Sequence, residues 1–330
     1  MLFYMQLIGM VTSKTILVPM LSTDNTLVPR IAMGFDSQRF KVVLDSTYTG
    51  FWISKQGCQG CGTEAGLITD QPSGQPEITQ QIHGTGKLTC EIHNGDLGLT
   101  PFPPSRVEVC AATFVENFNA GGANAFLGLA TPTLENQVVR NLLARVDHKM
   151  VALYWDPKRD ATLERIGHVG FGAIKDDLIG WVRWVPASDM FDTWTIAITI
   201  SFFNADIDVI STGPVVISTS NSESYFESVV FNALINILKA NKESAKFTVN
   251  YEYVLALPKL TLRLGQEYMT VHPIDLVRVE GEKTFIDFVN AETLPNVLGT
   301  RILSRFALVF DYDNRCVGFG EPIVGRNRKI

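Results

Sequence analysis

The sequence lacks long apolar runs, and this absence bears on membrane association. Among its 330 residues, no stretch approaches the roughly 20 consecutive apolar residues that a transmembrane helix needs. The short apolar run from Leu2 to Val11 has no basic residue before it and no small-x-small cleavage site after it, so it matches a signal peptide poorly. We expect neither a membrane span nor a membrane partner.

Positive charge is also scarce. Lys and Arg number 28 against 34 Asp and Glu, which gives a formal net charge of −6 and a pI near 5.4. The two signs are interspersed along the chain. Because proteins that bind nucleic acid usually present a basic face, this composition argues against nucleic acid as a direct partner. We expect the partners to be proteins.

Cysteine is sparse and odd in number, and N-glycosylation sequences are absent. The five cysteines are Cys58, Cys61, Cys90, Cys110 and Cys316. The chain is long enough to bury a large hydrophobic core, so it does not need disulfides for stability. An odd number of cysteines is therefore more typical of a protein in a reducing compartment. No Asn-x-Ser/Thr acceptor, the mark of a glycosylated secreted surface, occurs in the chain. We therefore expect a cytoplasmic protein, with secretion as the alternative.

The cysteine spacing leaves two interpretations open. Cys58 and Cys61 form a CxxC motif, but the second pair of a zinc site is absent, and so is the βαβ context of a thioredoxin-like redox motif. The motif is then either a local disulfide or two free thiols. Cys90 and Cys110 lie almost symmetrically about the turn at 100–104, so on antiparallel strands they would face each other. We expect no metal site and no cofactor.

Short β-like segments dominate the sequence. Runs rich in Val, Ile, Phe and Thr are separated by Gly, Pro, Asn and Asp, as in 15–20, 40–44, 107–114 and 194–200. Two stretches have helical periodicity instead. The first covers 134–147, with an apolar face of Val138, Leu142, Leu143 and Val146. The second covers 223–241, with an apolar face of Phe226, Val229, Val230, Leu234, Ile237 and Leu238. We predict a mostly β protein with a few short helices packed against its sheets.

Two distant segments repeat one pattern. Residues 40–47 (FKVVLDST) resemble residues 213–220 (GPVVISTS), because each is a hydrophobic strand that runs into a hydroxyl-rich turn. Each is followed later by two hydrophobic residues and a glycine, at 126–128 and at 297–299. The simplest account is a duplicated lobe.

Taken in order, these motifs resemble the pepsin-like aspartic proteases of the A1 family. Residues 30–34 and 40–53 resemble the first active-site strand and loop, with Asp45 and Trp52 where the family has its Asp and Trp. The other matching segments are the flap at 83–86, then 124–130, 170–172, 185–194, 257–260, 297–300 and 310–319. The resemblance implies a bilobal pepsin-like fold, with an N-terminal lobe over 1–176 and a C-terminal lobe over 177–330.

The resemblance also implies that the reaction is lost. Aspartic proteolysis uses two carboxyl groups: the ionised one activates water as general base, and the protonated one polarises the scissile carbonyl. Asp45 supplies the first, but Ser218 stands where the second belongs. A serine hydroxyl neither takes the proton nor carries the charge, and the members of a catalytic unit fail together. We predict that Asp45 and Ser218 are vestiges and that no residue is catalytically active.

Other positions around this former site depart from the family. Thr47 and Ser220 replace glycines whose missing Cβ lets backbone approach the reacting groups. Tyr48 and Asn221 replace small hydroxyl residues that bond the carboxylates. The Tyr48 ring either occupies the water and substrate space or turns into a hydrophobic neighbour. These departures all point away from catalysis.

The flap differs too. His83 stands where the family has tyrosine, ahead of the retained Gly84. A catalytic histidine needs a nucleophile within hydrogen-bond reach, and the nearby hydroxyls form no recognisable nucleophile motif. We interpret His83 as an exposed, freely titrating residue.

Two hydroxyls are kept. Ser46 and Thr219 occupy the positions that, in the family, cross-link the two loops through hydrogen bonds to the opposing backbone. Buried polar groups need such partners. Their retention indicates a preserved scaffold around a lost reaction.

Three functions fit these residues. The favoured one is an intracellular pseudoenzyme that acts as a protein-interaction scaffold, with homodimer formation as one option and ribonucleoprotein granules as one setting. The second is a secreted pseudo-protease that binds peptides or ligands in the former cleft. The third is a weak residual endopeptidase that uses Asp45 with water or a carboxylate from a partner.

Overall fold

The computed structural model describes residues 15–21, 27–61, 66–68, 77–82, 86–116, 123–130, 136–156, 165–189, 191–204, 207–243, 246–264, 266–292 and 295–323. Strands make up most of this part of the chain, and the helices are short. The mostly β class predicted from the sequence is therefore confirmed. Within the described residues, no helix is both long enough and apolar enough to cross a bilayer.

The strands of the first half are β1 (Ile16–Leu21), β2 (Arg30–Phe35), β3 (Gln38–Asp45), β4 (Phe51–Gln59), β5 (Ile78–Ile82), β6 (Gly86–Leu99), β7 (Phe102–Glu116), β8 (Ala125–Gly128), β9 (Met150–Trp155) and β10 (Arg165–Phe171). Those of the second half are β11 (Ile179–Pro186), β12 (Thr195–Asn204), β13 (Ile207–Ile217), β14 (Ser224–Phe226), β15 (Asn241–Glu243), β16 (Lys246–Val249), β17 (Leu260–Leu264), β18 (Glu267–Val271), β19 (Val277–Glu280), β20 (Lys283–Ile286), β21 (Phe288–Asn290), β22 (Asn296–Leu298), β23 (Ala307–Asp311) and β24 (Cys316–Pro322). The four β segments named from composition fall on β1, β3, β7 and β12, although β7 begins five residues before the predicted start at 107 and β12 ends four residues after the predicted end at 200.

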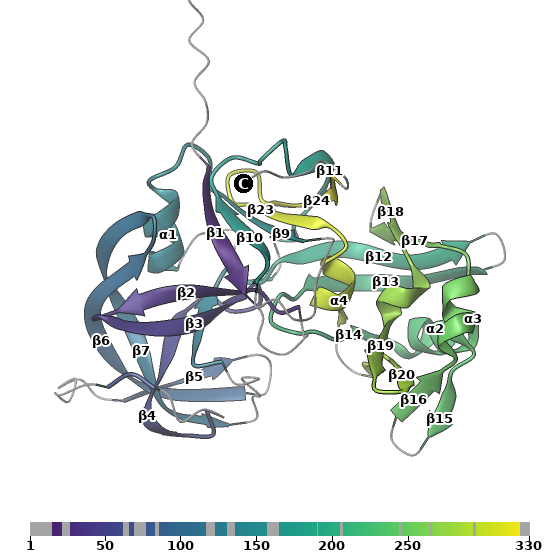
Figure 1. Ribbon diagram of the computed structural model, residues 1–330, viewed down its shortest axis with the longest axis horizontal. Coiled ribbons are helices and arrows are strands. Elements are labelled where there is room, and N and C mark those ends of the chain that lie inside the picture. The colour runs from purple at the N-terminus through teal and green to yellow at the C-terminus, as the bar shows by residue number, and fades with distance from the viewer. Residues whose placement is uncertain are drawn as a thin grey trace, which may run out of the picture.

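One sheet runs through both halves of the molecule. In the described part of the chain it has 13 strands, in the order β11-β24-β23-β9-β10-β1-β2-β3-β8-β4-β7-β6-β5. Strands from the two halves meet where β9 pairs antiparallel with β23, which sets Leu153 opposite Leu308. Figure 1 shows these joining strands between a purple-to-blue lobe and a green lobe. The lobe boundary predicted at residue 176 falls between β10 and β11.

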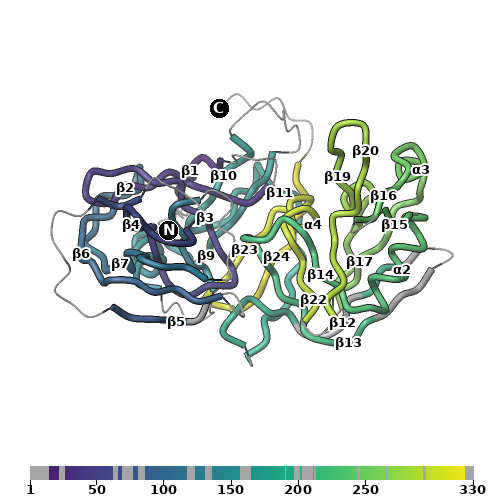
Figure 2. The backbone as a smooth tube through the Cα atoms, turned by 90° about the horizontal axis from the view of Figure 1, so that it is seen from below, coloured from purple at the N-terminus to yellow at the C-terminus, as the bar shows by residue number. Residues whose placement is uncertain are grey.

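Two further sheets belong to the second lobe. Among the described residues they have the orders β18-β17-β12-β13-β22-β14-β21 and β15-β16-β20-β19. The chain that leads from the green strands returns as β23 and β24, in yellow, to the sheet that joins the lobes (Figure 2). The last strands of the chain therefore pack beside strands of the first half, as a fold of two joined lobes requires.

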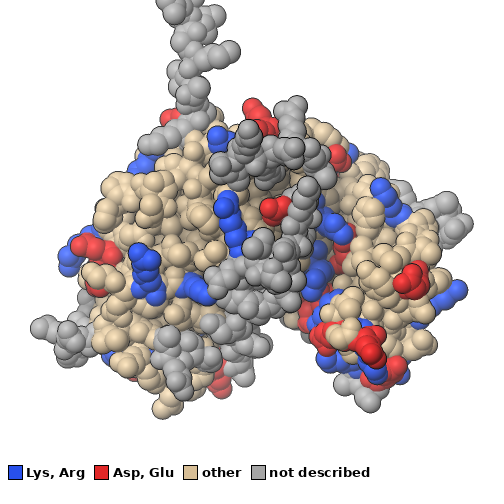
Figure 3. All heavy atoms as spheres, in the orientation of Figure 1, with Lys and Arg blue, Asp and Glu red and all other residues tan. Residues whose placement is uncertain are grey.

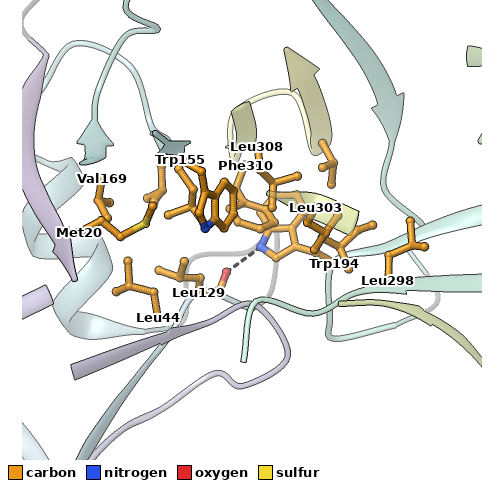
Figure 4. Close-up of a cluster of buried hydrophobic side chains, with 14 of the residues drawn as sticks. Met20, Leu44, Leu129, Trp155, Val169, Trp194, Leu298, Leu303, Leu308 and Phe310 are labelled. Atoms are coloured by element: carbon orange, nitrogen blue, oxygen red, sulfur yellow. Dashed lines mark hydrogen bonds between the residues drawn. The ribbon is translucent and has the colours of Figure 1, made fainter. Parts of the chain in front are cut away.

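A buried aromatic cluster fastens one lobe to the other. Trp194 is fully buried and donates a hydrogen bond from Nε1 to the carbonyl oxygen of Leu129 at 2.6 Å (Figure 4). The Tyr312 hydroxyl donates to the same carbonyl at 2.8 Å. The Trp194 ring also lies 5.1 Å from the ring centres of Phe310 and Tyr312. Both polar aromatic groups are thus satisfied while their rings fill the core.

The first helix is shorter than the periodicity predicts. Helix α1 covers Gln137–Leu143 within the predicted range 134–147. It begins where the Asn136 side chain accepts hydrogen bonds from the backbone of Val138 and Val139, a capping arrangement that starts a helix. Of the predicted apolar face, Val138, Leu142 and Leu143 are buried, whereas Val146 lies beyond the helix and is partly buried.

The second helix differs more from its predicted range. Helix α2 covers Ser228–Leu238, not 223–241, because Ser224–Phe226 form strand β14, which pairs with β21 and β22. Val229 was expected on the buried face but is 61% exposed, while Phe231 is buried. A start at Ser228 places Val229 in a solvent-facing first turn. Helices α3 (Tyr251–Ala256) and α4 (Thr300–Leu303) and the 3-10 turn η1 (Pro273–Leu276) are too short to show a periodicity in sequence.

Candidate functional site

Two strand-to-loop units of the same construction meet at the centre of the molecule. β3 ends at Asp45 and pairs in parallel with β8, which sets Asp45 opposite Gly128. β13 ends at Ile217 and pairs in parallel with β22, which sets Ile217 opposite Leu298. The repeated pattern of the sequence therefore corresponds to a repeated unit of structure.

Each strand-to-loop unit contains a glycine directly after two hydrophobic residues, Gly128 in the first unit and Gly299 in the second, and the packing requires glycine at both positions. A Cβ on Gly128 would lie 2.1 Å from the carbonyl oxygen of Tyr48, and a Cβ on Gly299 would lie 2.2 Å from that of Glu223. These are backbone atoms that no side-chain rotation can move away. Glycine at these positions lets the returning strand lie directly beneath the loop.

The two loops are cross-linked through Ser46 and Thr219. The Ser46 hydroxyl donates to the carbonyl of Ile217 at 2.6 Å, and the Thr219 hydroxyl donates to that of Leu44 at 2.6 Å. Each hydroxyl also accepts the backbone N–H of the other residue at 2.9 Å. Both side chains are fully buried. The cross-link expected from the resemblance is present in the structure, and it holds the loops in a fixed relation.

Asp45 lies at the meeting point of the loops and is fully buried. Its Oδ1 atom accepts hydrogen bonds from the Thr47 backbone at 2.8 Å, the Thr47 hydroxyl at 2.7 Å and the Ser220 hydroxyl at 3.0 Å. All three contacts place a donor on this oxygen, which complements an ionised carboxylate because such a group only accepts. Thr47 and Ser220 were expected to add bulk alone. Their hydroxyl groups were the signal in the sequence that they could also bond the carboxylate.

Ser218 is held by its own loop. Its hydroxyl accepts a hydrogen bond from Asn221 Nδ2 at 2.9 Å and lies 3.4 Å from the Ser220 hydroxyl. Because Ser220 in turn donates to Asp45, a chain of polar contacts runs from Asn221 through Ser218 and Ser220 to Asp45. Ser218 is therefore part of a hydrogen-bonded network that reaches Asp45.

Tyr48 turns away from the loops and into the first lobe. Its ring is buried in a cluster with Trp52, Cys110 and Phe126, and its hydroxyl accepts a hydrogen bond from Gln80 of β5 at 3.0 Å. Burial, together with the nearby charge of Asp45, raises the pKa of the Tyr48 phenol. Of the two orientations considered for this ring, the structure has the one in a hydrophobic neighbourhood.

Two of the singled-out residues are not placed by this structure. His83 and Gly84, at the flap position between β5 and β6, lie outside the described residues. Among the residues that are described, no group of three or more His, Cys, Asp or Glu side chains is arranged to hold a metal ion. The site is thus built from one carboxyl group and hydroxyl and amide groups.

Both cysteine pairs form disulfides. Cys58 bonds Cys61, and Cys90 bonds Cys110 across strands β6 and β7 with Cα atoms 5.4 Å apart. Cys90 and Cys110 are diagonal neighbours rather than directly opposed, because the pairing of β6 with β7 sets Cys90 opposite Ala112 and Cys110 opposite Ile92. Cys316 is free, and burial raises the pKa of its thiol to about 11.

A cross-linked pair of loops at the junction of two β lobes is the arrangement of a pepsin-like aspartic protease, and comparisons with known proteins agree. The family model of eukaryotic aspartyl proteases matches residues 27–322. The chain therefore belongs to this family, and the pepsin-like fold predicted from the sequence is confirmed.

Two relatives show how far the similarity extends. Gastricsin of Mus musculus is 22% identical over 334 residues, which cover 92% of this chain and 83% of gastricsin. The crystal structure of the aspartic proteinase from Irpex lacteus matches with a TM-score of 0.76 at 14% sequence identity, over 94% of this chain and 98% of that one. The shape of the fold is thus kept at low sequence identity.

Proposed function

We propose that this family member is catalytically inactive and works by binding other proteins. The proposal rests on Ser218, which stands where the family resemblance puts the second catalytic aspartate and whose hydroxyl is bound by Asn221 Nδ2 at 2.9 Å. Asp45 faces this hydroxyl network with Ser220 bridging the two. One carboxyl group cannot be both the general base and the proton donor in the same step.

The loss of a single member of a catalytic unit removes most of its effect. A positioned general acid or base contributes a factor of about 10² to 10⁴ in rate, and the remaining members do not compensate for one that is absent. The Ser220 hydroxyl is a second obstacle, because it already donates to the Asp45 oxygen. A water molecule poised for attack would have to compete for that oxygen.

The scaffold role is supported by the contacts that hold the fold together. The hydroxyl cross-link of Ser46 and Thr219, the two close-packed glycines and the aromatic cluster around Trp194 all maintain the shape of the fold. A fold held this firmly offers broad sheet surfaces for a protein partner or for a second copy of the chain. We place this role in the cytoplasm, in keeping with the odd cysteine count and the absence of N-glycosylation sequences.

Peptide hydrolysis at acid pH tests the loss of activity. Wild type, Asp45→Asn and an active aspartic proteinase as positive control are assayed on a library of quenched fluorescent peptides between pH 3 and pH 6. We expect wild type and Asp45→Asn to give the same background. Hydrolysis by the wild type that disappears in Asp45→Asn would restore the endopeptidase interpretation.

The binding role needs a separate measurement. Affinity purification from the native source identifies bound proteins, and light scattering on the pure chain reports its oligomeric state. The expected result is a stoichiometric protein partner or a homodimer. A monomer that recovers no partner under native conditions would contradict the scaffold role.

The two disulfides favour a second candidate, a secreted protein that binds peptides or ligands in the former cleft. Cys58–Cys61 and Cys90–Cys110 are both bonded, and such bonds persist in oxidising compartments. Peptide mapping without reductant, on protein from its native source, separates the candidates. A stoichiometric link between Cys90 and Cys110 supports secretion, and free thiols at both positions support the cytoplasmic scaffold.

A further inference from the structure

The second lobe contains a pocket of about 340 Å³ that shares no residue with the hydroxyl network of the two loops. It lies between helix α2, strand β16, the β19–β20 hairpin and strand β21. Pockets that hold small molecules have volumes from about 300 Å³ upward and combine mostly apolar walls with a few polar groups. This pocket has the volume and the composition of such a site.

Its walls are aromatic. Phe231, Phe247, Phe285 and Phe288 line it, and they come from four different elements. The Phe231 ring packs edge-to-face against Phe247, with centres 5.8 Å apart, and against Phe288, with centres 5.6 Å apart. Aromatic surfaces of this kind attract a flat apolar body, because ring pairs add to the energy of burial.

The polar lining of the pocket carries charges of both signs. Lys246 and Arg278 line it together with one carboxylate, Glu223. The Lys246 ammonium lies 4.9 Å from the centre of the Phe285 ring, and its side chain is 57% exposed, so the charge sits where the pocket meets solvent. Figure 3 shows the interspersed charges of both signs over this part of the molecule, where β15, β16 and β20 lie.

Arg278 adds donors to the same pocket. Its Nη1 atom donates to Glu223 at 2.8 Å and to the buried Asp287 at 3.1 Å, which fixes the guanidinium in place. Within the described residues both hydrogen bonds of the guanidinium come from Nη1 and none comes from Nη2. A guanidinium that is fixed by carboxylates and still has donors available at Nη2 is suited to an incoming anion.

A neighbouring carboxylate competes for both cations. Glu280 lies 2.8 Å from Arg278 Nε and 3.6 Å from Lys246 Nζ, although it is outside the pocket lining. An anionic ligand must therefore share these two cations with Glu280. Binding should be weak to moderate, and removal of the Glu280 charge should strengthen it.

We propose that this pocket binds a small aromatic carboxylate, with the ring system against the four phenylalanines and the carboxylate between Lys246 and Arg278. The assignment is independent of the loss of proteolysis, because no residue of the hydrogen-bonded network around Asp45 and Ser218 lines the pocket. It identifies a ligand site in the second lobe in addition to any protein-binding surface.

Isothermal titration with a matched pair of ligands tests the charge requirement. The probes are 2-naphthoate and its neutral amide, 2-naphthamide, which share the ring system and differ in charge. We expect 2-naphthoate to bind the wild type with a Kd below about 1 mM, where the binding free energy is about −4 kcal/mol, and the amide to bind more weakly. No detectable naphthoate binding, or equal binding of both ligands, overturns the proposal.

Three variants locate the carboxylate. Lys246→Ala should weaken the binding of 2-naphthoate about fivefold, as expected for the loss of a partly exposed ion pair. It should leave the binding of the amide unchanged. Glu280→Gln should strengthen 2-naphthoate by about threefold. Lys283→Ala is the matched control, because Lys283 lies on β20, is 62% exposed and pairs with Glu243 outside the pocket. Equal effects of the two lysine variants would overturn the assignment.

A fourth variant locates the ring system. Val289 lines the pocket and is 37% exposed, so Val289→Trp can fill the space without disturbing the buried core. We expect this variant to keep the wild-type circular dichroism and melting temperature and to lose naphthoate binding. Undiminished binding by a folded Val289→Trp protein would show that the ligand sits elsewhere.

Discussion

Ser46 and Thr219 exchange hydrogen bonds: the backbone N–H of each donates to the hydroxyl of the other at 2.9 Å, across 173 positions of sequence. Each hydroxyl donates onward to a backbone carbonyl of the opposite loop. Both side chains are therefore donor and acceptor at once in a fully buried place. This reciprocal arrangement is present in a chain in which a serine, Ser218, directly follows strand β13.

Removal of the Ser46 hydroxyl should destabilise the fold. Ser46→Ala leaves the N–H of Thr219 and the carbonyl of Ile217 buried without their partner, at a cost of about 1–3 kcal/mol. Urea denaturation of wild type and variant measures the loss. Ser222→Ala, the same chemical change at a partly exposed position, should stay within about 0.5 kcal/mol of wild type. Equal midpoints for the two variants would show that the cross-link contributes nothing to stability.

The two glycines beneath the loops should tolerate no side chain. Gly128→Ala and Gly299→Ala each place a Cβ no more than 2.2 Å from a backbone oxygen. This overlap should lower the free energy of unfolding by about 3 kcal/mol or prevent folding. Gly213→Ala is the matched control, since nothing lies within 4 Å of its Cβ position. Denaturation midpoints and soluble yield check the difference. A Gly128→Ala protein as stable as Gly213→Ala would refute the close approach.

The ion pair of Lys55 and Glu91 should make stability depend on pH. The Lys55 hydrogen bond holds the pKa of Glu91 below its ordinary value of 4.5. A carboxyl group whose pKa is lower in the folded state than in the unfolded state stabilises the protein at pH values above its unfolded-state pKa. This contribution is lost as the pH falls through the pKa of the folded state. Glu91→Gln should therefore lower the melting temperature at pH 7 and have little effect at pH 2.5.

The control for this pH test is Glu116→Gln. Glu116 pairs with Lys87 at 3.4 Å, but both side chains are well exposed, and such pairs contribute little. Melting temperatures of the two variants and of wild type, taken at pH 7 and pH 2.5, give the comparison. A deficit of Glu91→Gln that is as large at pH 2.5 as at pH 7 would exclude the ion pair as its cause.

Restoring the second carboxyl group alone should not restore hydrolysis. Ser218→Asp leaves Ser220 bonded to Asp45 and leaves threonine and serine where the family has glycine. Two adjacent buried carboxyl groups repel each other and raise the pKa of the one that is introduced, so the penalty is present at neutral pH and fades as both become protonated in acid. We expect a loss of more than about 2 kcal/mol at pH 7 and a smaller loss at pH 3.5.

Hydrolysis and denaturation assays on a series check this expectation. The series is Ser218→Asp, then Ser218→Asp with Thr47→Gly and Ser220→Gly, and Ser222→Asp as a control for an added charge outside the network. Only the triple variant should exceed the Asp45→Asn background at acid pH. Activity in the single variant would mean that Ser218 was the sole defect.

Much of the fold and of the candidate site follows from the amino-acid sequence alone. The β segments, the repeated strand-and-turn pattern and the hydrophobic-hydrophobic-Gly steps are local features, so composition and spacing were enough to indicate two lobes of one design. The prediction that Ser218 stands in place of a second catalytic carboxyl group needed only the order of the motifs. Residue identity decides such chemistry, because a hydroxyl cannot do the work of a carboxylate in any conformation.

Contacts between segments that are distant in sequence determined the features that the sequence did not predict. Ser224–Phe226 is a strand and not a helix because β21 and β22 offer it backbone partners, which outweigh local periodicity. The Tyr48 ring lies in the first lobe because Trp52, Cys110 and Phe126 gather there and Gln80 meets its hydroxyl. Thr47 and Ser220 became hydrogen-bond donors only once folding placed them at Asp45. Hydrogen bonds and packing across such separations depend on coordinates that no sequence window contains, whereas the missing carboxyl group is a property of the chain itself.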